Sequence, residues 1–255
     1  MLRPTLSRFY LVAIIALPFG ALTLVFGNLT LFAGVMVVFL TITGLGVAIP
    51  RMRLFGPFVC RGNNSQRCAA LTFDDGPDPR STPMLLDLLK EAKVEAVFFC
   101  IGKNVRMNLR LAERIVCEGH LLENHSYEHS NAANFFTTAR LKKTLAQTQM
   151  AIQEATGVVP QYFRPPMGLS NPRVFRAARE LGLKVIGWSA RGFDTQSTKP
   201  ERIVARIVRQ LEPGGIILLH DGKIPVARLV LTVKLLLATL RERGYEVVRL
   251  DKMFK

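Results

Sequence analysis

The chain of 255 residues carries a formal net charge of +15, and 49% of its residues are hydrophobic. A chain of this length can form one domain and an appendage. No recognised nucleic-acid-binding module accompanies the basic charge, so we discount nucleic acid as a partner and attribute the charge to attraction by anionic membrane lipids.

The N-terminal part of the chain is an uncharged apolar stretch from Phe9 to Ile49. It divides into residues 9–26 and 29–49, and each part is about as long as a membrane-spanning helix. A cleavable signal peptide is the alternative for the first part, but no small-x-small cleavage pattern follows Phe26. We therefore expect residues 1–59 to form a membrane anchor, a transmembrane hairpin of two hydrophobic helices.

Charges around this hairpin indicate its orientation. The turn between the helices is uncharged, whereas arginines flank both outer ends, namely Arg3, Arg8, Arg51 and Arg53. The positive-inside rule then predicts a multi-pass protein of the inner (cytoplasmic) membrane with its catalytic domain in the cytoplasm. Long domains are translocated regardless of charge, so an extracytoplasmic catalytic domain is the alternative.

The cysteines agree with a reducing compartment. Their spacing is not that of a metal knuckle, and two of them lie inside strand-like apolar runs; they are Cys60, Cys68, Cys100 and Cys117. A disulfide between Cys60 and Cys117 remains open at this point.

From residue 60 onward, apolar runs alternate with helix-like stretches. Predicted strands lie near 69–73, 94–101, 120–123, 160–163, 183–188, 215–219 and 245–250. Predicted helices lie near 82–92, 104–118, 138–156, 171–181, 200–211 and 226–243. This alternation predicts a parallel α/β sheet, and about seven units could close into a barrel with its active site at the carboxyl ends of the strands. We expect residues 60–255 to form this catalytic domain.

Two motifs contain the residue types of a hydrolytic metal site. The segment Thr72–Asp78 places two adjacent carboxylates, Asp74 and Asp75, where an apolar run breaks into a Gly-Pro turn. Consecutive residues that leave a strand point in different directions, so the two carboxylates can take different roles in one pocket. His125 and His129 lie four positions apart, and on one helical turn they would share a face and could hold one cation.

A third histidine, His220, ends another apolar run, as Asp74 does. The chain has only four histidines, so the placement of three of them near strand ends, together with Asp74, indicates a functional site. One carboxylate and two histidines leave coordination positions open on a metal ion, which metal-assisted hydrolysis requires.

These motifs resemble those of the polysaccharide deacetylases, the NodB-homology group of carbohydrate esterase family 4. The family's first motif matches Thr72–Asp78 at every position, and its second matches His125–His129. Its third, fourth and fifth motifs are similar to Arg164–Gly168, Trp188–Asp194 and Leu218–His220. The order and spacing of the family are kept across the whole expected catalytic domain.

The resemblance implies a fold, a reaction and a cofactor. The fold is a distorted, incomplete seven-stranded (β/α) barrel, and the reaction is hydrolysis of the N-acetyl group of an amino sugar. One divalent cation would be bound by Asp75, His125 and His129. Zinc is the expected ion, with cobalt, manganese or nickel as alternatives.

The same resemblance assigns roles to the residues around the cation. Asp74 would be the general base, and His220 would give a proton to the leaving nitrogen. Arg164 would hydrogen-bond Asp74 and keep it charged, while Asp194 would orient His220 and favour its charged form.

Two positions depart from the family pattern. Met167 stands where the family usually has Tyr or Trp, and Thr195 stands where it usually has Trp. Both positions shape the walls of the sugar groove in the family. The backbone N–H of Met167 would still help to hold the oxyanion, and Leu218 would line the pocket for the acetyl methyl group.

The hairpin, the basic charge and the missing groove aromatics together suggest a lipid-linked substrate. We expect an N-acetylated sugar on a polyprenyl-phosphate or similar carrier, used in cell-envelope biosynthesis or modification. One alternative is an extracytoplasmic deacetylase of peptidoglycan or exopolysaccharide, and another is a deformylase of a polyprenyl-phosphate-linked amino sugar. A membrane-anchored protein that only binds sugars is disfavoured, because the complete set of candidate catalytic residues is present.

Overall fold

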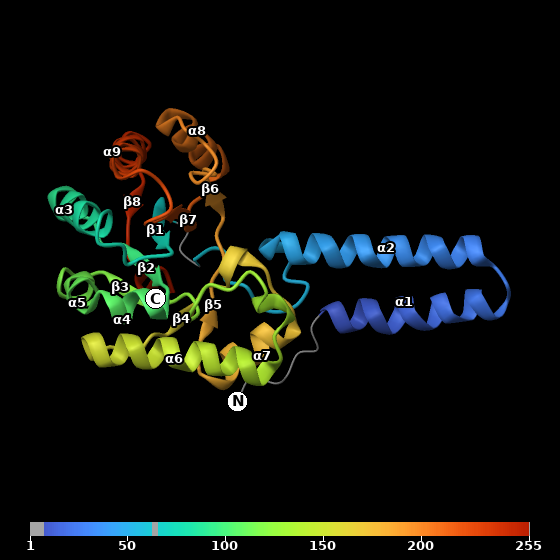
Figure 1. Ribbon diagram of the computed structural model, residues 1–255. Helices are drawn as coiled ribbons and strands as arrows, with labels where there is room; N and C mark the ends of the chain where they lie inside the picture. Colours follow the sequence, from blue (N-terminus) through green and yellow to red (C-terminus); the bar gives the residue numbers. More distant parts are fainter. Residues whose placement is uncertain (1–7, 63–65, 255) are drawn as a thin grey trace.

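A computed structural model describes residues 8–62 and 66–254, which form two N-terminal helices and an α/β domain (Figure 1). Arg3, one of the arginines in the orientation argument, lies outside the described residues. The strands are β1 (Cys68–Asp74), β2 (Val97–Cys100), β3 (Leu121–Asn124), β4 (Tyr162–Phe163), β5 (Lys184–Val185), β6 (Ala190–Arg191), β7 (Gly215–His220) and β8 (Glu246–Val247).

Two helices precede the strands in the chain, and the other helices alternate with them. The α-helices are α1 (Arg8–Val25), α2 (Leu29–Ala48), α3 (Thr82–Ala92), α4 (Gly102–Met107), α5 (Leu109–Cys117), α6 (Thr138–Thr156), α7 (Pro172–Glu180), α8 (Pro200–Gln210) and α9 (Val226–Glu242). The short 3-10 helices are η1 (Pro50–Met52), η2 (Ala133–Phe135), η3 (Pro166–Gly168) and η4 (Leu250–Phe254).

Local signals set most helix ends. The predicted helices at 82–92 and 138–156 are α3 and α6, and α6 stops at Gly157, which has a φ of 74° that glycine adopts without a Cβ clash. The predicted helix at 104–118 differs, because it divides at Asn108 into α4 and α5. Asn108 has φ −135° and ψ 53°, outside the helical region, so the chain changes direction there.

One parallel sheet organises the domain, in the order β5-β4-β3-β2-β1-β7-β6, with β8 also paired with β1. This curled sheet with its outer helices confirms the expected distorted, incomplete (β/α) barrel. The described residues form eight strands rather than seven, because the short strand β6 forms separately after β5. The segment before the domain contacts the sheet at two places. Val59 bridges to Ile186, just after β5, and Arg61 bridges to Gly215 at the start of β7.

Both faces of the central strands are buried. On β1, Leu71 and Phe73 belong to the core between the sheet and its outer helices. The alternate residue Ala70 packs inside the barrel with Phe99 and Ile216. Burial on both faces explains why these strands are continuous apolar runs in the sequence rather than alternating ones.

Strand register brings the candidate site residues to one edge of the sheet. Asp74 at the end of β1 pairs directly with His220 at the end of β7. Asn124 at the end of β3 pairs with the last residue of β4, so His125 and Arg164 leave the sheet side by side. The carboxyl edge of the sheet is therefore where the motifs meet.

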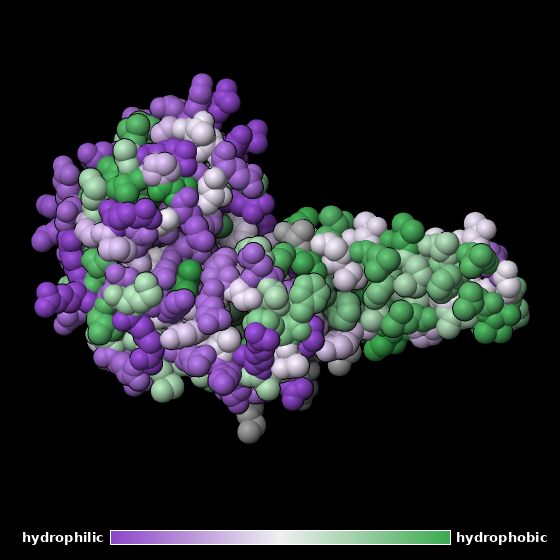
Figure 2. Space-filling view, viewed as in Figure 1, coloured by the Kyte–Doolittle hydropathy of each residue, from purple (hydrophilic) through white to green (hydrophobic). Residues whose placement is uncertain are grey.

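The hairpin of α1 and α2 projects away from the domain (Figure 1). Both helices are long and apolar enough to cross a membrane, and only 11% and 6% of the two spans is buried in the protein. Low burial distinguishes them from core helices of a soluble domain, although a signal sequence has the same properties. Figure 2 shows the hydrophobic surface that results along the hairpin.

The base of the hairpin packs against the domain. The Phe9 N–H donates to the Leu54 carbonyl oxygen at 2.9 Å, and the Phe9 ring lies 5.1 Å from the Phe55 ring. Phe58 then meets Phe175 of α7 edge to face, with ring centroids 5.1 Å apart. The division between residues 59 and 60 stays a prediction, since this connecting segment contacts both parts.

The cysteines are free thiols. Cys60 and Cys117 are not paired, so the disulfide left open by the sequence is absent. Cys60, Cys68 and Cys100 are buried as expected, whereas Cys117 is exposed at the end of α5.

Candidate active site and metal centre

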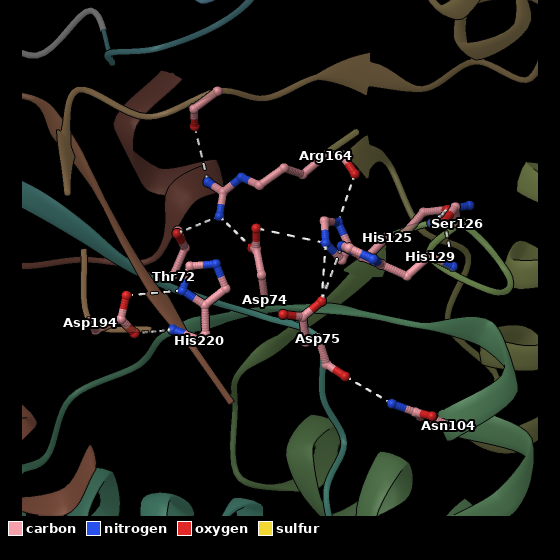
Figure 3. Close-up of polar contacts among 12 residues, drawn as sticks. Thr72, Asp74, Asp75, Asn104, His125, Ser126, His129, Arg164, Asp194 and His220 are labelled. Atoms are coloured by element: carbon pink, nitrogen blue, oxygen red, sulfur yellow. Dashed lines mark hydrogen bonds and ion pairs between the residues drawn. The ribbon is translucent and has the colours of Figure 1, made fainter. Parts of the chain in front are cut away.

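The turn after β1 separates the two neighbouring carboxylates. Asp74 still belongs to the strand, but Asp75 has a φ of 78°, which redirects its side chain. The Asp75 N–H donates to the Phe99 carbonyl oxygen at 3.2 Å, and the Asn104 side chain donates to the Asp75 carbonyl oxygen at 2.8 Å. Both carboxylates are buried, with 4% and 6% exposure, and both point towards His125 (Figure 3).

The two paired histidines meet in a loop rather than on a helix, so the helical turn expected for them is wrong. Ser126 and His129 have φ values of 64° and 49°, which lie outside the range of a right-handed α-helix. Hydrogen bonds hold this conformation, because the Ser126 N–H donates to the Asn124 side chain and the His129 N–H donates to the Ser126 hydroxyl. The rings of His125 and His129 lie 5.0 Å apart, so the loop achieves the proximity that a helix would have supplied.

Asp75, His125 and His129 form the one candidate metal group found among the described residues. Their ligand atoms all lie within 4.8 Å of one another. The Oδ1 atom of Asp75 is 3.6 Å from His125 Nε2 and 3.3 Å from His129 Nε2. This oxygen is buried and has no hydrogen-bond partner, which is costly unless a cation satisfies it.

The state of His125 also suits a metal ligand. Its Nδ1 lies 2.7 Å from the Arg164 carbonyl oxygen, which directs Nε2 at Asp75. Burial lowers the pKa of His125 to about 3, so the ring is neutral at physiological pH and has a lone pair available for a metal. The donor set of one carboxylate and two imidazoles therefore fits a divalent cation such as zinc.

Arg164 holds Asp74 from inside the barrel. The guanidinium is fully buried and donates to Asp74 Oδ1 at 2.7 Å, to the Thr72 hydroxyl at 2.7 Å and to the Gly187 carbonyl oxygen at 3.0 Å. It also stacks over the Phe99 ring at 4.1 Å. Burial nevertheless raises the pKa of Asp74 above its usual value, because it outweighs the opposing charges of Arg164 and His220. A buried carboxylate of raised pKa is a stronger base than a free one.

Asp194 holds His220 at two points. Its Oδ2 accepts the His220 backbone N–H at 2.8 Å, and its Oδ1 lies 3.0 Å from His220 Nδ1. Burial lowers the pKa of His220, but the hydrogen bond and charge of Asp194, with the charges of Asp74 and Asp75, outweigh burial and raise it overall. The ring is therefore held with Nε2 free and with its charged form favoured (Figure 3).

Met167 and Leu218 lie at the rim and the wall of the site. Met167 has a φ of 57° inside η3, and its side chain is 49% exposed. Leu218 is buried on β7, on the same side of the strand as Ile216, which packs inside the barrel. The structure therefore brings every predicted site residue to the carboxyl end of the barrel, with Leu218 lining its interior.

Sequence reasoning missed three residues that support this site. Thr72 shares the Arg164 guanidinium with Asp74, and Asn104 holds the backbone of Asp75. The third is Asp221, a buried carboxylate that accepts hydrogen bonds from two hydroxyl groups before and within α3. Thr72 lies in β1 and Asp221 follows β7 directly, so the rule that selected Asp74 could have selected these two, whereas Asn104 lies within α4 and has no such signal.

The chain is similar to a known protein family and to curated relatives. The model for polysaccharide deacetylases matches residues 61–186. A peptidoglycan-N-acetylglucosamine deacetylase of Bacillus cereus is 34% identical over 194 residues, which is 75% of this chain and 90% of that protein. The chain belongs to the polysaccharide deacetylase family. It is accordingly a hydrolase of the carbohydrate N-deacetylase class, a deacetylase of N-acetylated sugars.

Solved structures of relatives agree with this assignment. A mutant of BA3943, described as a CE4 family pseudoenzyme with restored enzymatic activity, has a TM-score of 0.72 and 28% identity, covering 80% of this chain and 73% of that one. A family 4 acetyl xylan esterase from Clostridium thermocellum, in complex with a cobalt ion, has a TM-score of 0.68 and 34% identity, covering 73% and 89%. Deacetylases of this family are metal-dependent, and the Asp75 group is the candidate metal site here.

Proposed function

We propose that this chain uses a divalent cation to remove the N-acetyl group from an amino sugar of a membrane-associated, lipid-linked glycan. The observation that carries the catalytic part is the buried cluster of one unpartnered carboxylate oxygen and two histidines, with Asp74 and His220 beside it. Acetate and a free amino sugar would be the products.

Asp75, His125 and His129 would hold the cation, zinc in our proposal. When bound there, a divalent cation supplies a Lewis acid that activates water and polarises the acyl carbonyl. Burial keeps His125 neutral, as a metal ligand must be. The hydrogen bond from His125 to a backbone carbonyl oxygen fixes the orientation of its ring.

Asp74 would be the general base. Arg164 binds its Oδ1, and its Oδ2 lies 3.8 Å from His125 Nε2, on the side of the candidate metal site. The arrangement leaves Oδ2 to take a proton from the nucleophilic water. Thr72 helps to fix the Arg164 guanidinium, and Arg164 limits the rotation of Asp74, so the carboxylate is oriented before the substrate arrives.

His220 would be the general acid on the opposite side of the site. Asp194 occupies Nδ1, so Nε2 carries the proton that passes to the departing nitrogen. The raised pKa of His220 keeps this proton in place near neutral pH. The backbone N–H of Met167 would stabilise the oxyanion, and Leu218 would contact the acetyl methyl group.

Three features support a lipid-linked substrate at the membrane. The hairpin is apolar over both helices, Lys and Arg outnumber Asp and Glu by 34 to 19, and Met167 replaces an aromatic residue in the groove for long polymers. We propose that the hairpin spans the inner membrane and that the domain lies on the cytoplasmic side, where anionic lipids attract it.

A second candidate is an extracytoplasmic deacetylase of peptidoglycan. The name of the Bacillus cereus relative, which matches 75% of this chain, favours it. In this alternative the hairpin is an uncleaved anchor and the domain is translocated.

Two measurements test the proposal and separate the candidates. Zinc-loaded protein is incubated with chito-oligosaccharides, with peptidoglycan and with a polyprenyl-phosphate-linked N-acetylhexosamine, and acetate release is followed. We expect the largest kcat/KM for the lipid-linked sugar, and equal or lower values there would refute that substrate. Alkaline phosphatase fused after Lys255 reports sidedness, and phosphatase activity in intact cells would favour the extracytoplasmic candidate.

A further inference from the structure

The loop that supplies the two candidate histidine ligands continues into an exposed aromatic side chain. We call residues 130–137 the rim loop; it follows His129 directly and contains η2. Phe135 in η2 is 82% exposed, and no large apolar side chain among the described residues is more exposed. Burial of this phenylalanine would be favourable, which makes Phe135 a candidate contact residue where it adjoins further apolar surface.

The rim loop lies beside the base of the hairpin. Phe136 packs against the core cluster that also receives Phe9 and Val47 from the hairpin. The Asn134 carbonyl oxygen accepts a hydrogen bond from the Asn171 side chain at the start of α7. In Figure 1 the segment before α6 lies on the side of the barrel from which α1 and α2 leave, and in Figure 2 hydrophobic surface continues from the hairpin onto the adjoining edge of the domain.

Basic side chains contact the residues on either side of Phe135. The Arg140 guanidinium stacks over the Phe136 ring at 3.6 Å, and Arg173 donates to the Asn134 carbonyl oxygen at 3.3 Å. Residues 130–153 contain no Asp or Glu. At the base of the hairpin, further exposed arginines are Arg8, Arg51 and Arg53.

We propose that the rim loop and the arginines at the hairpin base form a membrane-contact surface that fits an anionic lipid headgroup layer. This inference rests on the membrane insertion of the hairpin in the proposed function. An aromatic side chain flanked by arginines is the composition of a membrane–water interface, where the ring enters the acyl boundary and the cations meet lipid phosphates. Because the surface is continuous with the hairpin, lipid is its occupant rather than a separate protein.

Contact of the rim loop with the membrane would affect how a substrate reaches the candidate active site. The rim loop begins one residue after His129, and Asn134 and Met167 both line one cavity at this side of the barrel. Insertion of Phe135 would therefore hold this side of the barrel mouth at the level of the lipid headgroups. A sugar on a lipid carrier could then reach the site from the membrane plane.

Tryptophan quenching tests the surface directly. Full-length variants Phe135→Trp, Phe19→Trp and Met107→Trp are placed in nanodiscs of anionic lipids with brominated acyl chains, and the wild-type chain gives the background of Trp188. Phe19 lies in the middle of α1, and Met107 is a matched control because its side chain is 68% exposed at the end of α4.

We expect fluorescence at position 135 to fall by about twofold or more relative to unbrominated lipid, because interfacial aromatic side chains sit roughly 5–10 Å inside the boundary. Position 19 should be quenched at least as strongly and position 107 should not change. Quenching at 19 without quenching at 135, or equal quenching at 135 and 107, would overturn the proposed surface. Absence of quenching at 19 would overturn the membrane insertion of the hairpin, and this inference with it.

A second comparison tests the charge requirement. The same variant, Phe135→Trp, is measured in brominated zwitterionic nanodiscs. Weaker quenching than in anionic nanodiscs is expected, because arginine side chains draw the rim loop towards anionic headgroups. Equal quenching in both lipids would overturn the assignment of the surface to anionic lipid. Acetate release from soluble chito-oligosaccharides by Phe135→Ser should equal that of the wild type, which keeps this test separate from catalysis.

Discussion

The replacement Asp194→Asn tests whether Asp194 keeps His220, the candidate proton donor, in its protonated form. Asp194 is 1% exposed. One of its carboxylate oxygens accepts the His220 backbone N–H, and the other contacts Nδ1 of the His220 ring. Asparagine keeps the volume and one acceptor oxygen but loses the negative charge. The ring would then lose its charged partner while its backbone stays anchored, and the opposing effect of burial on the pKa would remain.

The size of the effect follows from the lost interaction. A hydrogen bond to a charged group contributes about 1.5–3 kcal/mol. At about 1.4 kcal/mol for each pKa unit, the pKa of His220 should fall by about 1–2 units. The pKa of His220 is raised in the wild type, so the protonated form is lost only at higher pH. In the variant this loss would come at lower pH, and the alkaline limb of the pH profile of kcat/KM should move by the same amount towards acid.

The assay is acetate release from a chito-oligosaccharide by the zinc-loaded enzyme across the pH range. Asp87→Asn is a matched control, because Asp87 is an exposed carboxylate paired with Arg114 on the protein surface. Its pH profile should follow that of the wild type. An alkaline limb that does not move in Asp194→Asn would refute the view that Asp194 keeps His220 protonated, and would point to another group as the proton donor.

Three further changes test the remaining parts of the site. Asp74→Asn should lower kcat by about 10²–10⁴-fold without lowering bound zinc, measured by acetate release and metal analysis, and near wild-type turnover would exclude Asp74 as the base. His129→Ala should reduce zinc content and activity together while circular dichroism stays unchanged, and full zinc occupancy would exclude it as a ligand. Gly168→Ala should cost about 1–3 kcal/mol in thermal unfolding, because its Cβ would lie 2.2 Å from Trp188 Cη2. Gly157→Ala is its control, since it shares a positive φ but meets nothing within 4 Å, and equal losses would refute the steric argument.

Local signals were sufficient for the order of strands and helices. The end of α6 follows from Gly157 at its own terminus, which needs no tertiary partner. The convergence of Asp74 and His220 could also be predicted, because the carboxyl ends of parallel strands meet at one edge. Family motifs then supplied the candidate roles of each side chain, and those roles stay predictions.

Side-chain hydrogen bonds within a loop and contacts between distant segments decided the rest. The helical turn predicted for His125 and His129 fails because the Asn124 side chain and the Ser126 hydroxyl stabilise a loop. The supporting contact of Asn104 with Asp75 joins segments whose approach depends on the whole barrel.

The amino-acid sequence by itself determined the two apolar helices, the alternating domain and the side chains gathered at its strand ends. These depend on hydrophobic periodicity and on chain direction, which are local or topological properties. Only the tertiary structure decided the protonation preferences, because the pKa of Asp74 depends on how deeply the surrounding barrel buries it. The rim loop was also decided there, since Phe135 is an ordinary apolar residue in the sequence and becomes exposed only through the packing of its neighbours.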